Sequence, residues 1–132
     1  MKKNNIRCHV LNYHIVWCTK YRFKVLKNKV EAELKELLEN ICSKYGCDLV
    51  EIETMPDHVH LFVSTGVSES PADVVRTLKS ISARELFKKF PDLKKFYGRC
   101  GVMWSRGYFI GTAGKASSET IRRYIAEQKT SA

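Results

Sequence analysis

The chain has 132 residues, of which 44% are hydrophobic and 28% charged, and its net charge is +9. This length favours one domain with its own hydrophobic core. No segment approaches the roughly 18 apolar residues of a membrane span. Five scattered cysteines, an odd number, argue against a disulfide framework, so we expect reduced thiols in a cytoplasmic protein.

The charges are segregated along the chain. Residues 1–30 hold eight Lys or Arg and no acid, residues 31–73 hold two basic against ten acidic residues, and residues 74–115 hold ten basic against two acidic. This pattern favours basic surfaces facing an anion, with nucleic acid the leading candidate. Aromatic residues alternate with the basic ones in 20–24 (KYRFK) and 104–109 (WSRGYF), which suits stacking on single-strand bases. The alternative is a solvated basic surface whose aromatic rings face the core.

The first predicted element is a strand over residues 7–17 (RCHVLNYHIVW), rich in aromatic and β-branched types. Its better core face holds Leu11, Tyr13, Ile15 and Trp17. His9 lies with that face and His14 lies opposite it. His14 could approach other histidines if their strands are neighbours, although a structural hydrogen bond is the simpler interpretation.

A helix follows from Asn28 to Tyr45, where apolar residues recur at helical spacing and the outer face is acidic. Asn28 can cap its start, and Gly46 suits a left-handed residue at its end. Residues 47–55 alternate as a half-buried strand. Pro56-Asp57 then predicts a tight antiparallel connection, with Asp57 interpreted as a turn residue.

The next strand begins with a His-x-His pattern in residues 55–63 (MPDHVHLFV) and ends at Gly66. Alternation places His58 and His60 on one face, with Phe62 beyond them, and leaves the other face apolar. Two imidazoles side by side suit a divalent metal. The alternative is that two polar residues merely open a half-exposed strand.

A second helix is predicted from a Ser70 cap and Pro71 as far as Pro91, with basic residues on its exposed side. Residues 92–101 read as a basic loop, 102–110 as a strand with a possible bulge at Gly107, and 111–114 as a flexible joint. The last helix runs from residue 119 to about 129, capped by Ser117 or Ser118.

The element order β-α-β-β-α-β-α predicts an α+β, ferredoxin-like (RRM-like) sandwich in which two helices cover one face of an antiparallel sheet. The single domain comprises a sandwich core of about residues 6–111 and a C-terminal helix of about 117–130. In that helix Tyr124 and Gln128 lie four residues apart and share a face. The alternative is a tyrosine at the edge of an ordinary amphipathic helix.

Four segments together resemble a known family. They are residues 14–21 (HIVWCTKY), 55–61 (MPDHVHL), 104–111 (WSRGYFIG) and 124–128 (YIAEQ), in order over nearly the whole chain. The chain resembles the small HUH transposases of the TnpA type, which have one catalytic tyrosine and mobilise insertion sequences as single-stranded DNA. The closely related transposases linked to repetitive palindromic elements are the alternative.

This resemblance implies a role for each matching residue. Tyr124 would attack the scissile phosphate and leave a 5′-phosphotyrosine with a free 3′-hydroxyl. His58, His60 and Gln128 would bind a divalent cation, Mg²⁺ or Mn²⁺. The resemblance also implies a homodimer, possibly with exchanged tyrosine helices, acting on DNA hairpins at element ends.

DNA contacts are expected by analogy on the basic surfaces. Backbone contacts are expected from Lys20, Arg22, Lys79, Arg84 and Arg106, and stacking from Tyr21 and Trp104. Two rival functions remain: a domesticated nickase and ligase of hairpins, and a single-strand binding module without turnover. The co-occurrence of the two histidines with Tyr124 and Gln128 favours catalysis, because a pure binder has no use for all four.

Overall fold

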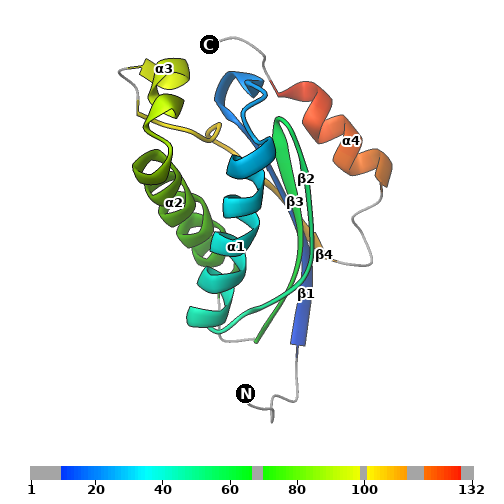
Figure 1. Cartoon of the computed structure of the whole chain (residues 1–132). Helices are drawn as coiled ribbons and strands as arrows, with labels where there is room; N and C mark the ends of the chain where they lie inside the picture. Colours follow the sequence, from blue (N-terminus) through cyan, green and yellow to red (C-terminus); the bar gives the residue numbers. More distant parts are fainter. Residues whose placement is uncertain (1–9, 67–69, 99–100, 113–117, 129–132) are drawn as a thin grey trace.

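The computed structural model describes residues 10–66, 70–98, 101–112 and 118–128. Within these ranges four strands form one antiparallel sheet in the order β2-β3-β1-β4. The strands are β1 (Val10–Cys18), β2 (Asp48–Met55), β3 (His58–Gly66) and β4 (Phe109–Thr112). Helices α1 (Asn28–Lys44) and α2 (Pro71–Lys89) cover one face, and α4 (Ser118–Glu127) lies on the other (Figure 1). The predicted α+β sandwich with an additional C-terminal helix is confirmed.

The hydrophobic core lies between the sheet and the pair α1 and α2. Side chains alternate along β3, so Val59, Leu61 and Val63 all point to this core and are fully buried. Burying a side chain of this kind stabilises the fold by about 1.5–3 kcal/mol. The core also contains Ile15, Trp17, Leu34, Leu38, Leu78 and Leu86. His58, His60 and Phe62 consequently share the other face of a well-anchored strand.

The helix ends agree with the sequence at α2 and differ at α1. Ser70 caps α2 by accepting a hydrogen bond from the backbone N–H of Asp73 at 3.4 Å, and Pro71 is the first helical residue. At α1 the cap position belongs to Lys27, because Asn28 already lies inside the helix, with φ of 55°. Gly46 has φ of 81°, as its position after the helix predicts.

The predicted strand over 102–110 is wrong for most of its length, because regular pairing begins only at Phe109. Before it, Trp104 forms one isolated bridge with Thr19. The ammonium of Lys79 donates to the carbonyls of Ser105, Arg106 and Gly107 at 2.8, 3.4 and 2.9 Å. Those carbonyls face a cation instead of a neighbouring strand. The first two residues of the predicted joint at 111–114 belong to β4, and the other two lie outside the described residues.

Other boundaries differ in smaller ways. The predicted loop over 92–101 includes a 3₁₀ turn at Pro91–Leu93 and the short helix α3 (Lys94–Tyr97), whose Tyr97 is buried in the core. The beginning of the first predicted strand, with His9, and the predicted cap Ser117 lie outside the described residues. Among the described helices, none combines the length and apolar character needed to cross a membrane.

Candidate active site

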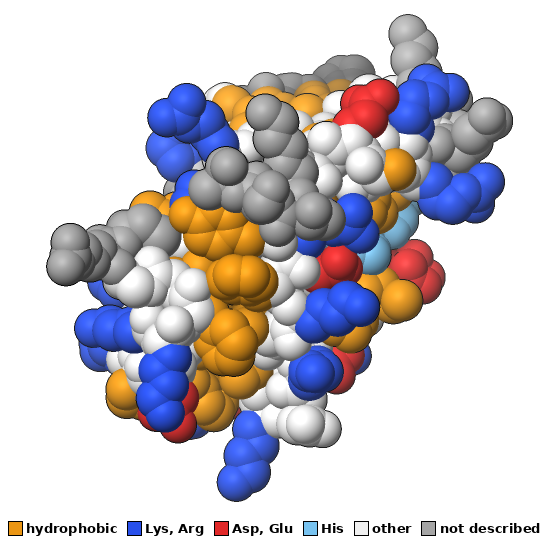
Figure 2. All heavy atoms as spheres, turned by 90° about the horizontal axis from the view of Figure 1, so that it is seen from above, with side chains coloured by type: hydrophobic (Ala, Val, Ile, Leu, Met, Phe, Trp, Pro, Cys, Tyr) orange, Lys and Arg blue, Asp and Glu red, His pale blue; other side chains and the backbone are white. Residues whose placement is uncertain are grey.

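The two histidines of β3 lie on the sheet face opposite the core, at the start of the strand. Their side chains are 17% (His58) and 25% (His60) exposed, so both are sheltered but accessible. Figure 2 shows histidine side chains (pale blue) at the surface beside both acidic and basic side chains. The β2–β3 hairpin and the pairing of β3 with β1 fix their backbone, as the sequence pattern predicted.

His58 is oriented by the residue before it. Its Nδ1 lies 2.9 Å from Oδ1 of Asp57. Burial alone would raise the pKa of Asp57, but the hydrogen bond with His58 and the nearby Arg22 guanidinium outweigh burial and lower that pKa. An ionised carboxylate only accepts hydrogen bonds, so His58 donates from Nδ1 and keeps the lone pair of Nε2 free. Carboxylate-bound imidazoles of this type are typical of metal ligands.

His60 makes its contacts with the two neighbouring strands. Its Nε2 lies 2.9 Å from Nδ1 of His14 on β1, and its Nδ1 lies 3.7 Å from a carboxylate oxygen of Glu53 on β2. Burial lowers the pKa of His60, and the neighbouring His14 lowers it further. The ring is therefore neutral near pH 7, which is the form that binds a metal. His14 approaches the histidine face, as its position in the first strand allowed.

The tyrosine helix α4 packs on β1 of its own chain. The ring of Tyr124 lies 6.0 Å, centre to centre, from that of Phe109 on β4. Its hydroxyl is shielded from solvent and has no hydrogen-bonding partner among the described residues. Burial raises the pKa of Tyr124, and Cys18 raises it further. Since Cys18 pairs with His58 across the β1–β3 ladder, Tyr124 and His58 have a neighbour in common.

Gln128 lies one turn beyond Tyr124, and its amide Nε2 donates to the Tyr124 carbonyl at 3.1 Å, which leaves the amide oxygen as a possible ligand. The described residues contain no cluster of three or more His, Cys, Asp and Glu side chains arranged for a metal. A site here would instead combine two imidazoles with one amide oxygen. This donor set fits a divalent ion, because the carboxylate of Asp57 orients one of the two imidazoles.

The residues expected to contact DNA divide into two groups. Arg84 and Arg106 are exposed, and Lys20 is partly exposed, with its ammonium 5.1 Å from the centre of the Tyr21 ring. Tyr21 is itself half-buried, and its ring packs near Phe23. These four side chains remain accessible for a DNA partner.

The other three expected contacts make hydrogen bonds within the protein, and their role in DNA binding stays a prediction. Arg22 binds Asp57, and Lys79 binds the three carbonyls of residues 105–107. Trp104 is 4% exposed, packs edge-on against Trp17 and donates from Nε1 to the Lys79 carbonyl at 3.0 Å. Trp104 is buried, whereas Arg22 and Lys79 are partly exposed.

The sequence interpretation took Asp57 as a turn residue, with a small chance of reaching the metal shell, whereas the structure shows its carboxylate on Nδ1 of His58. The one signal available was its place immediately before a histidine, where a carboxylate can reach an imidazole nitrogen.

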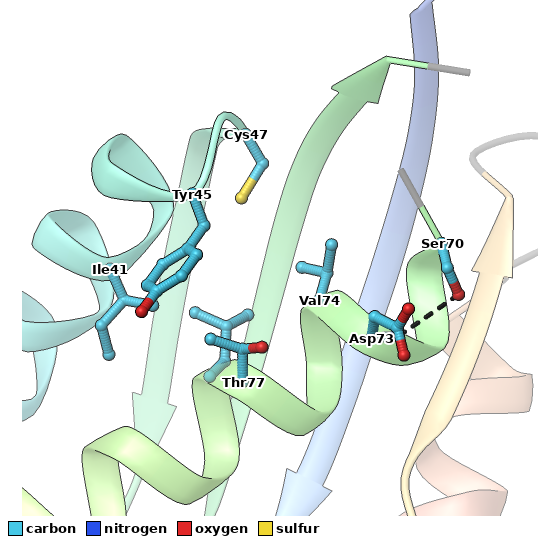
Figure 3. A pocket seen from close by; sticks show the side chains of 8 residues that line it. Ile41, Tyr45, Cys47, Ser70, Asp73, Val74 and Thr77 are labelled. Atoms are coloured by element: carbon cyan, nitrogen blue, oxygen red, sulfur yellow. Dashed lines mark hydrogen bonds between the residues drawn. The ribbon is translucent and has the colours of Figure 1, made fainter. Parts of the chain in front are cut away.

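A surface pocket of about 250 Å³ lies away from this site, on the helical side of the sheet (Figure 3). It opens between the end of α1 and the start of α2. Its lining is mostly apolar, and its Ser70 hydroxyl already caps α2. The lining residues are Ile41, Tyr45, Cys47, Ser70, Asp73, Val74, Thr77 and Leu78. The pocket brings no catalytic set of side chains together.

Sequence comparison relates the chain to transposases. Residues 7–128 match the family described as "Transposase IS200 like". The chain is 39% identical over 129 residues to the ISDra2 transposase TnpA of Deinococcus radiodurans, covering 97% of this chain and 91% of that protein. It is 31% identical over 116 residues to the transposase for insertion sequence element IS200 of Salmonella typhimurium, covering 88% and 75%.

Structural comparison agrees. A crystal structure from Deinococcus radiodurans, described as a transposase, superposes with a TM-score of 0.88 at 38% identity over the whole of both chains. A REP-associated tyrosine transposase bound to a REP hairpin gives a TM-score of 0.56 at 9% identity, covering 97% of this chain and 70% of that one, a likeness of fold alone. With its tyrosine helix docked on a His-x-His sheet face, the chain belongs to the IS200-like transposase family, the HUH single-tyrosine TnpA type, whose activity is DNA cleavage and transfer.

Proposed function

We propose that the chain cleaves and rejoins single-stranded DNA at hairpin-marked element ends, with Tyr124 as the nucleophile. The observation that supports this most is the packing of α4 on β1, the strand whose Cys18 acts on the pKa of Tyr124 and pairs with His58 across the ladder. A helix tyrosine and a His-x-His strand far apart in sequence thus meet on one sheet face.

In the proposed reaction the phenolic oxygen of Tyr124 attacks the phosphorus and the bond from phosphorus to the 3′ oxygen breaks. The phenol loses its proton and the departing 3′ oxygen gains one, so that a 5′-phosphotyrosine and a 3′-hydroxyl result. The covalent ester conserves the energy of the broken bond. A 3′-hydroxyl from another junction can then reverse the step without ATP.

His58, His60 and Gln128 would hold a Mg²⁺ or Mn²⁺ ion. Such an ion supplies charge neutralisation at a non-bridging phosphate oxygen. Imidazole and amide ligands are softer than Mg²⁺ usually prefers, so we expect Mn²⁺ to support activity better in vitro. In the protein itself Asp57 keeps His58 oriented, and the lowered pKa of His60 keeps that ring neutral.

The docked position of Tyr124 bears on the order of events. Its hydroxyl is buried and its raised pKa keeps it protonated, so a phosphate reaches it only after α4 shifts. We therefore propose that DNA binding precedes exposure of the nucleophile. A homodimer with exchanged tyrosine helices would provide such a shift. Lys20, Arg84 and Arg106 are the accessible cations that would hold the DNA backbone.

The test is incubation with end-labelled single-stranded DNA from the flanks of the encoding gene, with Mn²⁺ or EDTA, followed by denaturing gel electrophoresis. We expect a metal-dependent covalent protein–DNA adduct that is absent in Tyr124→Phe. Tyr45→Phe is the matched control, because Tyr45 is 49% exposed and lies at the end of α1.

Two results would contradict the proposal. An adduct that persists in Tyr124→Phe would mean another nucleophile. Hairpin binding with no adduct under any divalent metal would favour a binding module without turnover.

A further inference from the structure

The turn after β1 has an unusual backbone. Tyr21 and Arg22 have φ values of 63° and 54°, the left-handed region that residues with side chains rarely enter. Each such residue costs roughly 1–2 kcal/mol. The surrounding hydrogen bonds hold the turn in place: the Thr19 amide donates to the Asp57 carbonyl at 3.0 Å, and its hydroxyl donates to the Phe23 carbonyl at 2.7 Å. Backbone strain of this kind persists when the surrounding contacts compensate for it, and here it fixes the position of one side chain.

That side chain is the Arg22 guanidinium, which is 23% exposed and reaches two different parts of the site. Its Nε and Nη2 each lie 3.1 Å from Oδ2 of Asp57. Its Nη1 donates to the Ile125 carbonyl on α4 at 3.3 Å. The planar fork of arginine can serve both acceptors at once, whereas the single ammonium of a lysine cannot.

Each of these contacts leads directly to a group of the proposed reaction. The other oxygen of Asp57 binds Nδ1 of His58, so Arg22 acts on His58 through one carboxylate. Ile125 follows Tyr124, and its carbonyl also accepts from the backbone N–H of Gln128 at 3.2 Å. The guanidinium therefore lies at the carboxyl end of α4, where a positive charge is favourable. The same end of the helix carries Gln128.

We propose that Arg22 is a positioning residue that couples the orientation of His58 to the docking of the tyrosine helix. This inference rests on the proposed function, because it takes His58 as a metal ligand and Tyr124 as the nucleophile. Coupling between two sites is reciprocal. A cation bound at His58 therefore stabilises the docked α4, and release of α4 weakens the hold on the cation.

The experiment measures two properties of the full chain with and without Mn²⁺. Hydrogen–deuterium exchange of the amides of residues 121–128 reports the docking of α4, and titration calorimetry reports Mn²⁺ affinity. The variants are Arg22→Met, Arg22→Lys and Asp57→Asn. The matched control is Arg76→Met on α2. The side chain of Arg76 is 70% exposed and pairs with Asp73.

Arg22→Met should lower the protection of the α4 amides by about 10- to 100-fold, as expected for losing a hydrogen bond to a charged group. Asp57→Asn should weaken Mn²⁺ binding by about 10- to 100-fold, the usual effect of losing the partner of a metal-binding histidine. Arg22→Lys should retain part of the Mn²⁺ affinity through Asp57 without restoring α4 protection. Mn²⁺ should raise α4 protection in the wild type and in Arg76→Met, and should raise it less in Arg22→Met, where only Gln128 still links the cation to α4.

Equal α4 exchange in Arg22→Met and Arg76→Met would overturn the inference, and a Tyr124 adduct formed by the wild type would then leave the proposed function intact. Unchanged α4 protection on adding Mn²⁺ to the wild type would overturn the coupling. If Arg22→Met does not fold, Arg22→Lys still tests the bridge, since full α4 protection in that variant would refute it. A wild type that forms no adduct and binds no Mn²⁺ would overturn both the proposed function and the inference.

Discussion

Replacing the proposed nucleophile should make the protein more stable. Tyr124 has a hydroxyl that is shielded from solvent and has no hydrogen-bonding partner among the described residues. A buried, unpaired polar group of this kind costs about 1–3 kcal/mol. Tyr124→Phe keeps the ring in its place beside Phe109 and removes only the hydroxyl. We expect the free energy of unfolding at pH 7 to rise by about 1–3 kcal/mol. For a chain of this length, each kcal/mol should raise Tm by roughly 4 °C.

The difference should grow at alkaline pH. Burial raises the pKa of Tyr124 in the folded protein, whereas the unfolded chain releases the same proton near the ordinary value of 10.0. Above about pH 10 the folded wild type therefore retains a proton that the unfolded chain has lost. The stability of the wild type then falls with rising pH. Tyr124→Phe has no such proton, so its advantage over the wild type increases above pH 10.

Urea denaturation followed by circular dichroism, at pH 7 and pH 10.5, measures both effects. Tyr45→Phe is the control, because the half-exposed Tyr45 should change stability by no more than about 0.5 kcal/mol. A Tyr124→Phe variant less stable than the wild type at pH 7 would refute the reasoning. It would mean that the hydroxyl has a hydrogen-bonding partner in solution.

Three further outcomes are expected. His58→Ala combined with His60→Ala should abolish metal-dependent cleavage of labelled DNA, and undiminished cleavage would contradict the metal assignment. Lys79→Met should lower the free energy of unfolding by about 1.5–3 kcal/mol, since three carbonyls lose their cation. Arg84 is exposed, so the control Arg84→Met should change that free energy by less than about 0.5 kcal/mol in the same urea denaturation. Binding to single-stranded hairpins, measured by fluorescence anisotropy, should weaken steeply with salt. Arg106→Ala should reduce the slope of the logarithm of the binding constant against the logarithm of salt concentration by about 0.7–0.9. A flat salt response would contradict a phosphate-binding surface.

Local patterns in the sequence were sufficient to predict the framework of the site. Alternation along β3 placed His58 and His60 on one face, because the side-chain period of a strand is two. Ser70 and Pro71 predicted the start of α2, because capping depends on a few adjacent residues. The order of elements then predicted the sandwich, and four short segments in series indicated the family.

Charge and aromatic character alone could not predict which side chains make hydrogen bonds within the protein. Arg22, Lys79 and Trp104 looked like the other members of the basic surface, but the structure engages each of them internally. Their hydrogen-bonding partners lie 22 or more residues away in the chain. The tertiary fold alone brings such groups within hydrogen-bonding distance.

The sequence by itself therefore determined the fold class, the histidine face and the tyrosine helix, which depend on local periodicity and capping. The tertiary structure decided that Asp57 orients His58, that Arg22 reaches α4 and that the hydroxyl of Tyr124 is shielded from solvent. Those arrangements depend on contacts between segments as far apart as residues 22 and 125, and on how much water the packing excludes. Neither these long-range contacts nor the exclusion of water can be read from the spacing of residues along one element.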